Sequence, residues 1–574
     1  MDVTSTKRGV LLAFTALLLS CKGSHPSSFE NLQSAFIDWY FKYHPVQALR
    51  YERSGDYLGF MAFDASSREE YTADVSRFLI ELSQIDATKL SPPERIDYNM
   101  LFAKLESLKY ELDILRSWEW NPLLVLQEVF EGLFLVSEKP ELEMSRRVEV
   151  ATIQLAQLPQ VVEAAALQLL YHSSIHEKRA GLLIEQLISL LEELPLKLNA
   201  DNLTLDDIDR KIEHSIVALE DYGDFLTGSI SQKEKKMFPQ DFPVDESAFN
   251  HYSGNRYQLE KVIRTAEKKI IPLENRIFHL SLPLYLQDHD EPVWLDRDDT
   301  LEVIRWSVNT IRNAPEDLIA GNQVLSGFYN SLSELESFIY SNNLFHDKYH
   351  ASIRLDFAPS YSSNSEPAFL YHYYPKDYTR EMVYYIKQPG ETETRYILNK
   401  KEIDILNGKR IFPGFALQWW QAQRQASVLR YLFPAEITLA GWQYYALNMV
   451  IEEGFGDWQT DYHILKLTEE LELVQSALAE IQYYRGEISR EEVKSTLMNK
   501  AYTPEENVAS KLNTMETRFF HYSQSFIGLI ELHSIVHEYK KNKGDDFILA
   551  EFHRLALQEG IVPIHELKKL FQFL

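Results

Sequence analysis

Residues 91–115 read SPPERIDYNMLFAKLESLKYELDIL, and they give the strongest indication of fold class in the chain. The pair Pro92-Pro93 follows Ser91 and fits the first turn of a helix, where a backbone N–H is not needed. Five leucines then recur in alternating steps of four and three, which places them on one helical face: Leu101, Leu105, Leu108, Leu112 and Leu115. The stretch predicts a long helix with one apolar face.

Helical spacing extends over most of the chain. A first helix is predicted over residues 29–43, where Ser27 and Glu30 have the spacing of a capping box. Other helices are predicted over residues 148–158, 161–171, 179–194, 204–226, 257–278 and 300–340. After Gly414 the spacing returns over residues 442–451, 465–484, 490–498, 508–539 and 547–558.

Between these helical parts, the pattern changes to short runs rich in aromatic and β-branched residues. Strands are predicted over residues 353–357, 368–374, 382–386 and 395–398. We therefore expect a mainly α protein with one small β-sheet. No fixed-period repeat, low-complexity segment or clean linker divides it. The expected body is one unit over residues 28–574: helical over 28–340, with the sheet in 349–399, and helical again over 414–574.

Composition agrees with a large helical protein. Of 574 residues, 45% are hydrophobic, while glycine and proline number only 21 and 22, too few for the many turns of an all-β fold. The formal charge of −27 excludes a broad basic surface for nucleic acid and disfavours an electrostatic contact with anionic lipid. Any membrane attachment must have another cause.

The N-terminus supplies such a cause. Residues 1–20 carry Lys7 and Arg8 and then an apolar run, as a secretory signal does. The run ends in Leu-Leu-Ser-Cys at Cys21, which resembles the bacterial lipobox, and Cys21 is the only cysteine. We expect cleavage before Cys21, acyl chains on that residue and a polar tether over residues 21–27. The expected location is the cell envelope, on the outer membrane or the periplasmic face.

Several phrases of the sequence resemble a known family. They are FIDWY at 36–40, HPVQA at 44–48, ERIDY at 94–98, FILAEFH at 547–553 and EGIVP at 559–563. With these phrases in this order and spacing, the chain resembles the family called bacterial domain of unknown function 885. Members of that family are often secreted or lipid-anchored. The likeness extends from about Phe29 to Leu570.

The resemblance implies a metallopeptidase-like site made from two motifs. The first is His-Glu-x-x-Pro-Gly-His, with two imidazole ligands and a glutamate that activates a metal-bound water. The second, a phrase like Glu-Gly-Trp-Ala-Leu-Tyr-Ala-Glu, adds a carboxylate ligand. Three protein ligands, one open position and a general base are the ordinary requirements of zinc catalysis.

In this chain the ligand positions hold other residues. The first motif aligns with KRIFPGF at 409–415, so Lys409 and Phe415 replace the two histidines and Arg410 replaces the glutamate. The second aligns with AGWQYYAL at 440–447, so Ala440 replaces its first glutamate and a leucine its last. None of these side chains binds zinc, and two cations repel a metal ion. We expect no catalytic residue and no cofactor here, and we expect the four positions to converge in space.

Two other sets of side chains are candidates for chemistry. His533 and His537 are four apart in a predicted helix and could hold one metal ion, but no third ligand is assigned, and solvated or core histidines are the alternative. The adjacent glutamates at 452–453 and 469–470 point about 100° apart in a helix. We expect these two pairs to lie on a solvated face.

Tyrosines crowd the predicted sheet, at positions 371, 373, 374, 384, 385 and 396. Tyr371 and Tyr373, with Trp442 and Tyr445, could line a groove for an extended peptide. The alternative is that these tyrosines pack the sheet against the helices. Lys409 and the neighbouring arginine would offer positive charge to a ligand carboxylate, or would neutralise acids of the protein itself.

The sequence leaves three functions open. The first is a lipid-anchored envelope protein without catalytic activity, which binds a peptide-like ligand or another envelope protein. The second is an active peptidase or other hydrolase with a rebuilt active site. The third is a purely structural envelope protein. Bound zinc in the purified protein would favour the hydrolase.

Overall fold

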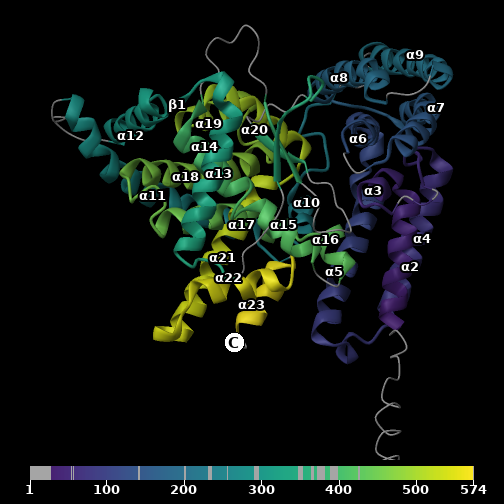
Figure 1. Ribbon diagram of the computed structural model, residues 1–574. Coiled ribbons are helices and arrows are strands. Elements are labelled where there is room, and N and C mark those ends of the chain that lie inside the picture. The colour runs from purple at the N-terminus through teal and green to yellow at the C-terminus, as the bar shows by residue number, and fades with distance from the viewer. Residues whose placement is uncertain are drawn as a thin grey trace, which may run out of the picture.

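The computed structural model describes most of the chain from Ser28 to Gln572, and Figure 1 shows it as a ribbon. Within that range, residues 54, 56, 140–141, 199–201, 231–235, 255, 290–296, 347–352, 363–367, 372–381, 388–397 and 425–426 are outside the description. The predicted signal and tether, with Cys21, precede it. In the described part, no helix combines the length and apolar character that a membrane-spanning segment needs.

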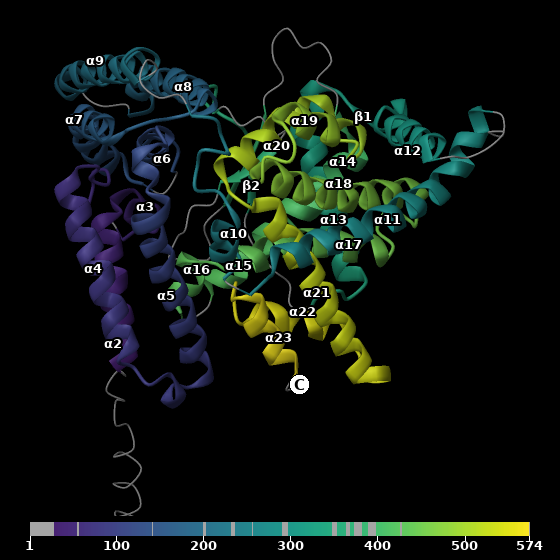
Figure 2. The same cartoon turned by 180° about the vertical axis from the view of Figure 1, so that it is seen from behind.

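The N-terminal helices form one side of the molecule in both views (Figures 1 and 2). They are α2 (Ser28–Tyr43), α3 (Pro45–Arg50), α4 (Ala65–Ser83), α5 (Pro92–Tyr110), α6 (Leu123–Glu138), α7 (Met144–Gln168), α8 (Ser174–Leu198) and α9 (Asn202–Phe225). The predicted helix at 91–115 is confirmed. Ser91 and Glu94 form a capping box, and a single wider turn, Glu111–Leu115, extends α5 to the last leucine.

The other side holds the remaining helices. They are α10 (Glu246–Tyr252), α11 (Leu259–Asp288), α12 (Arg297–Arg312), α13 (Val324–Ser341), α14 (Lys400–Arg410), α15 (Phe415–Gln423), α16 (Val428–Leu432), α17 (Glu436–Glu452), α18 (Thr460–Tyr484), α19 (Arg490–Asn499), α20 (Glu505–Thr517), α21 (His521–Lys543), α22 (Leu549–Gln558) and α23 (Ile564–Gln572). The mainly α fold class is confirmed.

Two predicted helices are interrupted. The segment 300–340 divides into α12 and α13 because Pro315 disfavours helical backbone at the residue before it. The segment 508–539 divides into α20 and α21 at Phe520, whose φ of 58° lies in the left-handed region. The new N-terminus of α21 is satisfied by the buried carboxylate of Glu480, which accepts from the backbone N–H groups of Tyr522 and Ser523.

The small sheet has three strands in the order β2-β4-β3. β2 (Ile353–Phe357) runs parallel to β4 (Met382–Ile386), and β3 (Ala368–Tyr371) runs antiparallel to it. The predicted fourth strand is described only as β5 (Leu398–Asn399), and it does not join this sheet. It pairs with β1 (Leu318–Ile319), a two-residue strand that the sequence pattern did not indicate.

β4 separates two hydrophobic cores. Met382, Tyr384 and Ile386 belong to the core of the C-terminal helices, whereas Val383 and Tyr385 belong to the core of α6 to α9. Successive side chains of a strand point to opposite faces, so one buried strand serves both cores. Tyr384 and Tyr385 are therefore buried and pack the sheet against the helices on either side.

A third core joins α2, α4 and α5 to α15 and α16. Each of these helices contributes more than one buried side chain, and one example from each, in chain order, is Phe36, Phe78, Leu101, Trp419 and Leu429. Because α15 follows directly on the first motif segment, this core attaches the motif region to the N-terminal helices.

Candidate functional site

The first motif segment is the connection between α14 and α15. Lys409 and Arg410 end α14, and Phe415 begins α15. A Cβ on Gly414 would lie 1.8 Å from the Lys409 carbonyl oxygen, so only glycine fits this turn. Gly414 is therefore required by the backbone, independently of any metal ligand.

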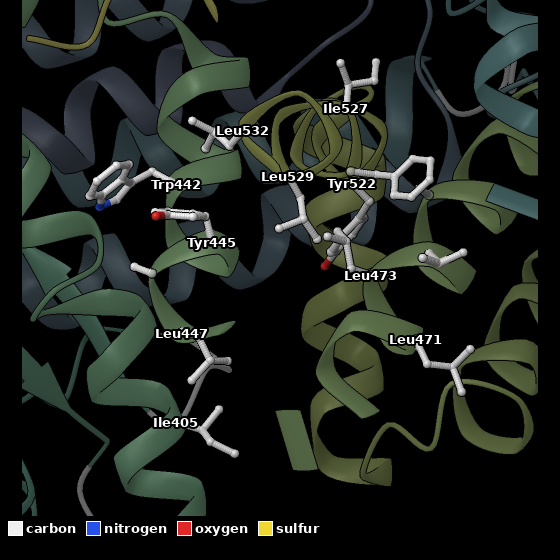
Figure 3. Close-up of a cluster of buried hydrophobic side chains, with 14 of the residues drawn as sticks. Ile405, Trp442, Tyr445, Leu447, Leu471, Leu473, Tyr522, Ile527, Leu529 and Leu532 are labelled. Atoms are coloured by element: carbon white, nitrogen blue, oxygen red, sulfur yellow. The ribbon is translucent and has the colours of Figure 1, made fainter. Parts of the chain in front are cut away.

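The second motif segment lies in α17, which packs along α21. A Cβ on Gly441 would lie 2.3 Å from the backbone carbon of Gly528, so the two helices approach as closely as their backbones permit. Figure 3 shows Trp442, Tyr445 and Leu447 from α17 among the side chains of this buried cluster. Ala440 is 4% exposed, and its small side chain is part of the packed interior.

The structure brings the two motif segments into contact. The Trp442 indole N–H donates to the Pro413 carbonyl over 2.9 Å. The Lys409 ammonium lies 4.5 Å from the centre of the Tyr444 ring. Phe415 points along its own helix to Trp419, with ring centres 5.9 Å apart.

Lys409 forms an ion pair with Glu469 of α18, 2.6 Å from Nζ to Oε2. Both side chains are largely removed from solvent, with 14% and 21% exposed. Burial opposes the charge of Lys409, but the Glu469 carboxylate outweighs it and raises the pKa of the lysine. Burial likewise opposes the charge of Glu469, and Lys409 overcomes this to lower the pKa of the glutamate. Both groups are charged at neutral pH.

A second ion pair lies one turn further along α18. Lys511 of α20 contacts Glu472 over 3.1 Å and lies 5.3 Å from the Tyr522 ring centre. The two glutamates are three residues apart and so share a helical face. Each lysine is thus held by one carboxylate and one tyrosine ring.

His521 lies among these cations at the N-terminus of α21. Burial, Arg518, Arg410 and Lys511 together hold the pKa of His521 well below its usual value. The imidazole is neutral at physiological pH. Lys409, Lys511 and Arg518 each have a carboxylate partner of their own, so most of the positive charge around His521 is compensated within the protein.

Trp442 and Tyr445, the predicted groove residues on α17, are 1% and 4% exposed. Tyr445 donates its hydroxyl to Nε2 of His553 over 2.8 Å, because Nδ1 of that histidine donates to the Leu344 carbonyl over 2.7 Å. Burial lowers the pKa of His553 to about 4. Neither α17 side chain presents an accessible face to a ligand in this conformation.

The other predicted groove residues are less fully described. Tyr371 ends β3 opposite Val383, and its side chain is outside the description. Tyr373, Tyr374 and Tyr396 lie wholly outside the described residues.

The two histidines of α21 have different surroundings. His533 is partly buried with its ring 6.2 Å from that of Tyr445, and His537 is exposed. Burial lowers the pKa of His533. Within the described ranges, no three histidine, cysteine, aspartate or glutamate side chains are grouped to hold a metal ion.

The expectation of a solvated face is wrong for one glutamate pair. Glu452 is well exposed, but Glu470 is buried and pairs with Lys269 of α11 over 3.1 Å, while Glu469 pairs with Lys409. α18 is enclosed by α11, α17 and α21, so both of these acidic side chains meet protein. They point to different partners, as adjacent helical residues should.

The chain is thus a mainly helical protein in which the connection after α14 contacts α17. The chain matches the family described as "Bacterial protein of unknown function (DUF885)" over residues 53–570, and it belongs to that family.

Two solved structures share the fold. A candidate lipoprotein of unknown function from Shewanella oneidensis is 18% identical with a TM-score of 0.79, over 95% of this chain and 100% of that one. A candidate lipoprotein from Colwellia psychrerythraea is 14% identical with a TM-score of 0.78, over 96% and 99%. The search of curated proteins gives no match.

Proposed function

We propose that this protein is a lipid-anchored component of the bacterial cell envelope that acts by binding, without metal-dependent catalysis. The observation that carries the proposal is the Lys409–Glu469 ion pair, which places a lysine with its own counter-charge at the first motif position. A neutralised pair offers neither a ligand to zinc nor a base to a metal-bound water.

The rest of the motif region supports this proposal. Arg410, Phe415 and Ala440 stand at the other ligand positions and do not fit a zinc ion. Two buried histidines of the C-terminal helices are poor metal ligands as well. Both ring nitrogens of His553 form hydrogen bonds, to Tyr445 and Leu344, and His521 lies among cations. The bound species would be a peptide-like ligand or another envelope protein.

The anchor is supported by the sequence and by the two structural neighbours described as candidate lipoproteins. Ser28 begins α2, so the lipid on Cys21 would precede the folded part by only a few residues. The protein would then stay close to the membrane surface.

The test is a peptide-turnover assay with the mature protein, using a mixed fluorogenic peptide library with added zinc and, separately, with chelator. We expect no turnover above the background hydrolysis in either condition. The variant Lys409→His/Arg410→Glu/Phe415→His/Ala440→Glu restores the ligand types and serves as the comparison, although absent supporting contacts should keep its activity low. Chelator-sensitive cleavage by the unmodified protein would establish the rebuilt hydrolase instead.

A further inference from the structure

A groove of about 700 Å³ runs between α7 and α9 near the C-terminal ends of both helices. Its apolar lining includes Val162, Leu167 and Leu170 on one side and Phe225 on the other. In both views α7 and α9 lie apart from α14, α15 and α17, the helices that carry the motif region (Figures 1 and 2).

Two large apolar side chains of the groove face solvent. Leu167 is 79% exposed and Leu170 is 61% exposed. Single exposed leucines are common on protein surfaces, but neighbouring ones that line a concave surface mark an interaction site. A partner that covers them removes apolar area from water.

The rim of the groove is acidic. Glu163 of α7 and Asp221 of α9 are exposed and line it, one from each helix. Neither carboxylate forms an ion pair within the described part of the chain. They are therefore available to basic groups of a partner.

This charge distribution selects among possible occupants. A second copy of the chain would bring its own acidic rim against this one, and an anionic lipid surface would be repelled. A helix with an apolar face and flanking lysines or arginines complements both the apolar lining and the acidic rim of the groove. Such a helix presents its anchors at i, i+3, i+4 and i+7.

We propose that the α7/α9 groove is a docking site for an amphipathic, basic helix of another envelope protein. This site is independent of the motif region, and it stands whether or not the motif region binds a ligand.

The experiment uses two fluorescent helical peptides of about 18 residues with the same leucine stripe, one with lysines and one with glutamates at its polar positions. Binding to the full mature chain is followed by fluorescence anisotropy. The lysine peptide should bind and the glutamate peptide should not. Leu167→Asp should weaken binding at least about tenfold, and the double variant Glu163→Gln/Asp221→Asn several-fold with a smaller salt dependence.

The matched control is Leu196→Asp on α8, since Leu196 is 85% exposed but does not line the groove. It should leave binding unchanged, which separates docking from attraction to an acidic protein. The proposal is overturned if the lysine peptide fails to bind, or if both leucine variants have the same effect. It is also overturned if sedimentation shows a dimer that Leu167→Asp abolishes, or if anionic vesicles bind through Leu167.

Discussion

Lys409 and Glu469 are 60 positions apart in the sequence, and their charged atoms meet 2.6 Å apart beside the connection of α14 to α15. The pair explains how a lysine is accommodated at a buried position of this motif region. A buried cation requires a partner, and α18 provides one at the required place.

Removal of one partner should be destabilising. Lys409→Met leaves the Glu469 carboxylate without its counter-charge and should lower the free energy of unfolding by about 2–3 kcal/mol. The double variant Lys409→Met/Glu469→Gln should recover most of this loss. Urea unfolding of the four proteins of the cycle measures the coupling. As a control, Lys89→Met breaks an exposed pair with Asp86 and should change nothing measurable. Additive effects of the two substitutions would contradict the pairing.

The turn between the motif helices should tolerate only glycine. Gly414→Ala places a Cβ against the Lys409 carbonyl oxygen and should destabilise by about 3 kcal/mol or more. Gly408→Ala, six residues earlier inside α14, meets only the Leu447 side chain at 3.5 Å and should be neutral or stabilise by up to about 1 kcal/mol. Thermal unfolding compares them. Equal melting temperatures would show that the turn relaxes freely.

The pH dependence of stability should include a contribution from His553. Its pKa of about 4 in the folded protein lies below the ordinary 6.5, so the folded state binds fewer protons than the unfolded state between these values. The stability that comes from keeping His553 neutral is fully present above pH 6.5 and is lost as the pH falls towards 4. The loss in the free energy of unfolding reaches at most about 3 kcal/mol. His553→Asn should flatten the profile in this window, measured by urea unfolding from pH 4 to 8. His537→Asn, at an exposed site, should not alter stability. A wild-type profile in the His553 variant would refute the assignment.

The anchor is tested in cells. Cys21→Ala removes the only thiol that can take a lipid, so the variant should accumulate as uncleaved precursor or as a soluble form. Membrane fractionation and intact mass measure this. An unchanged mass with normal membrane association would exclude a lipoprotein.

Local signals in the sequence predicted most of the fold. The leucine steps of α5, its proline-containing first turn and the strands at 353–357 and 382–386 all appear where expected. These elements depend on spacing that a single segment carries. The division between α20 and α21 was missed because it depends on Glu480, which lies about 40 residues earlier in the chain.

The candidate site was predicted only in part. The alignment with the two family motifs predicted that residues 409–415 and 440–447 lie together. It did not predict the partner of Lys409. The spacing of Glu469 and Glu472 indicates one acidic face on α18, yet only tertiary packing decides that this face meets Lys409 and Lys511 rather than water. The tautomer of His553 likewise depends on a carbonyl group 209 positions away.

The central claim is that the motif region holds an ion pair in place of a metal. The most direct measurement is the metal content of the mature protein after equilibration with excess zinc and extensive dialysis, together with its melting temperature with and without chelator. The mature protein should hold no stoichiometric zinc, and chelator should leave its melting temperature unchanged. One zinc ion per chain, with a melting temperature that chelator lowers, would contradict it.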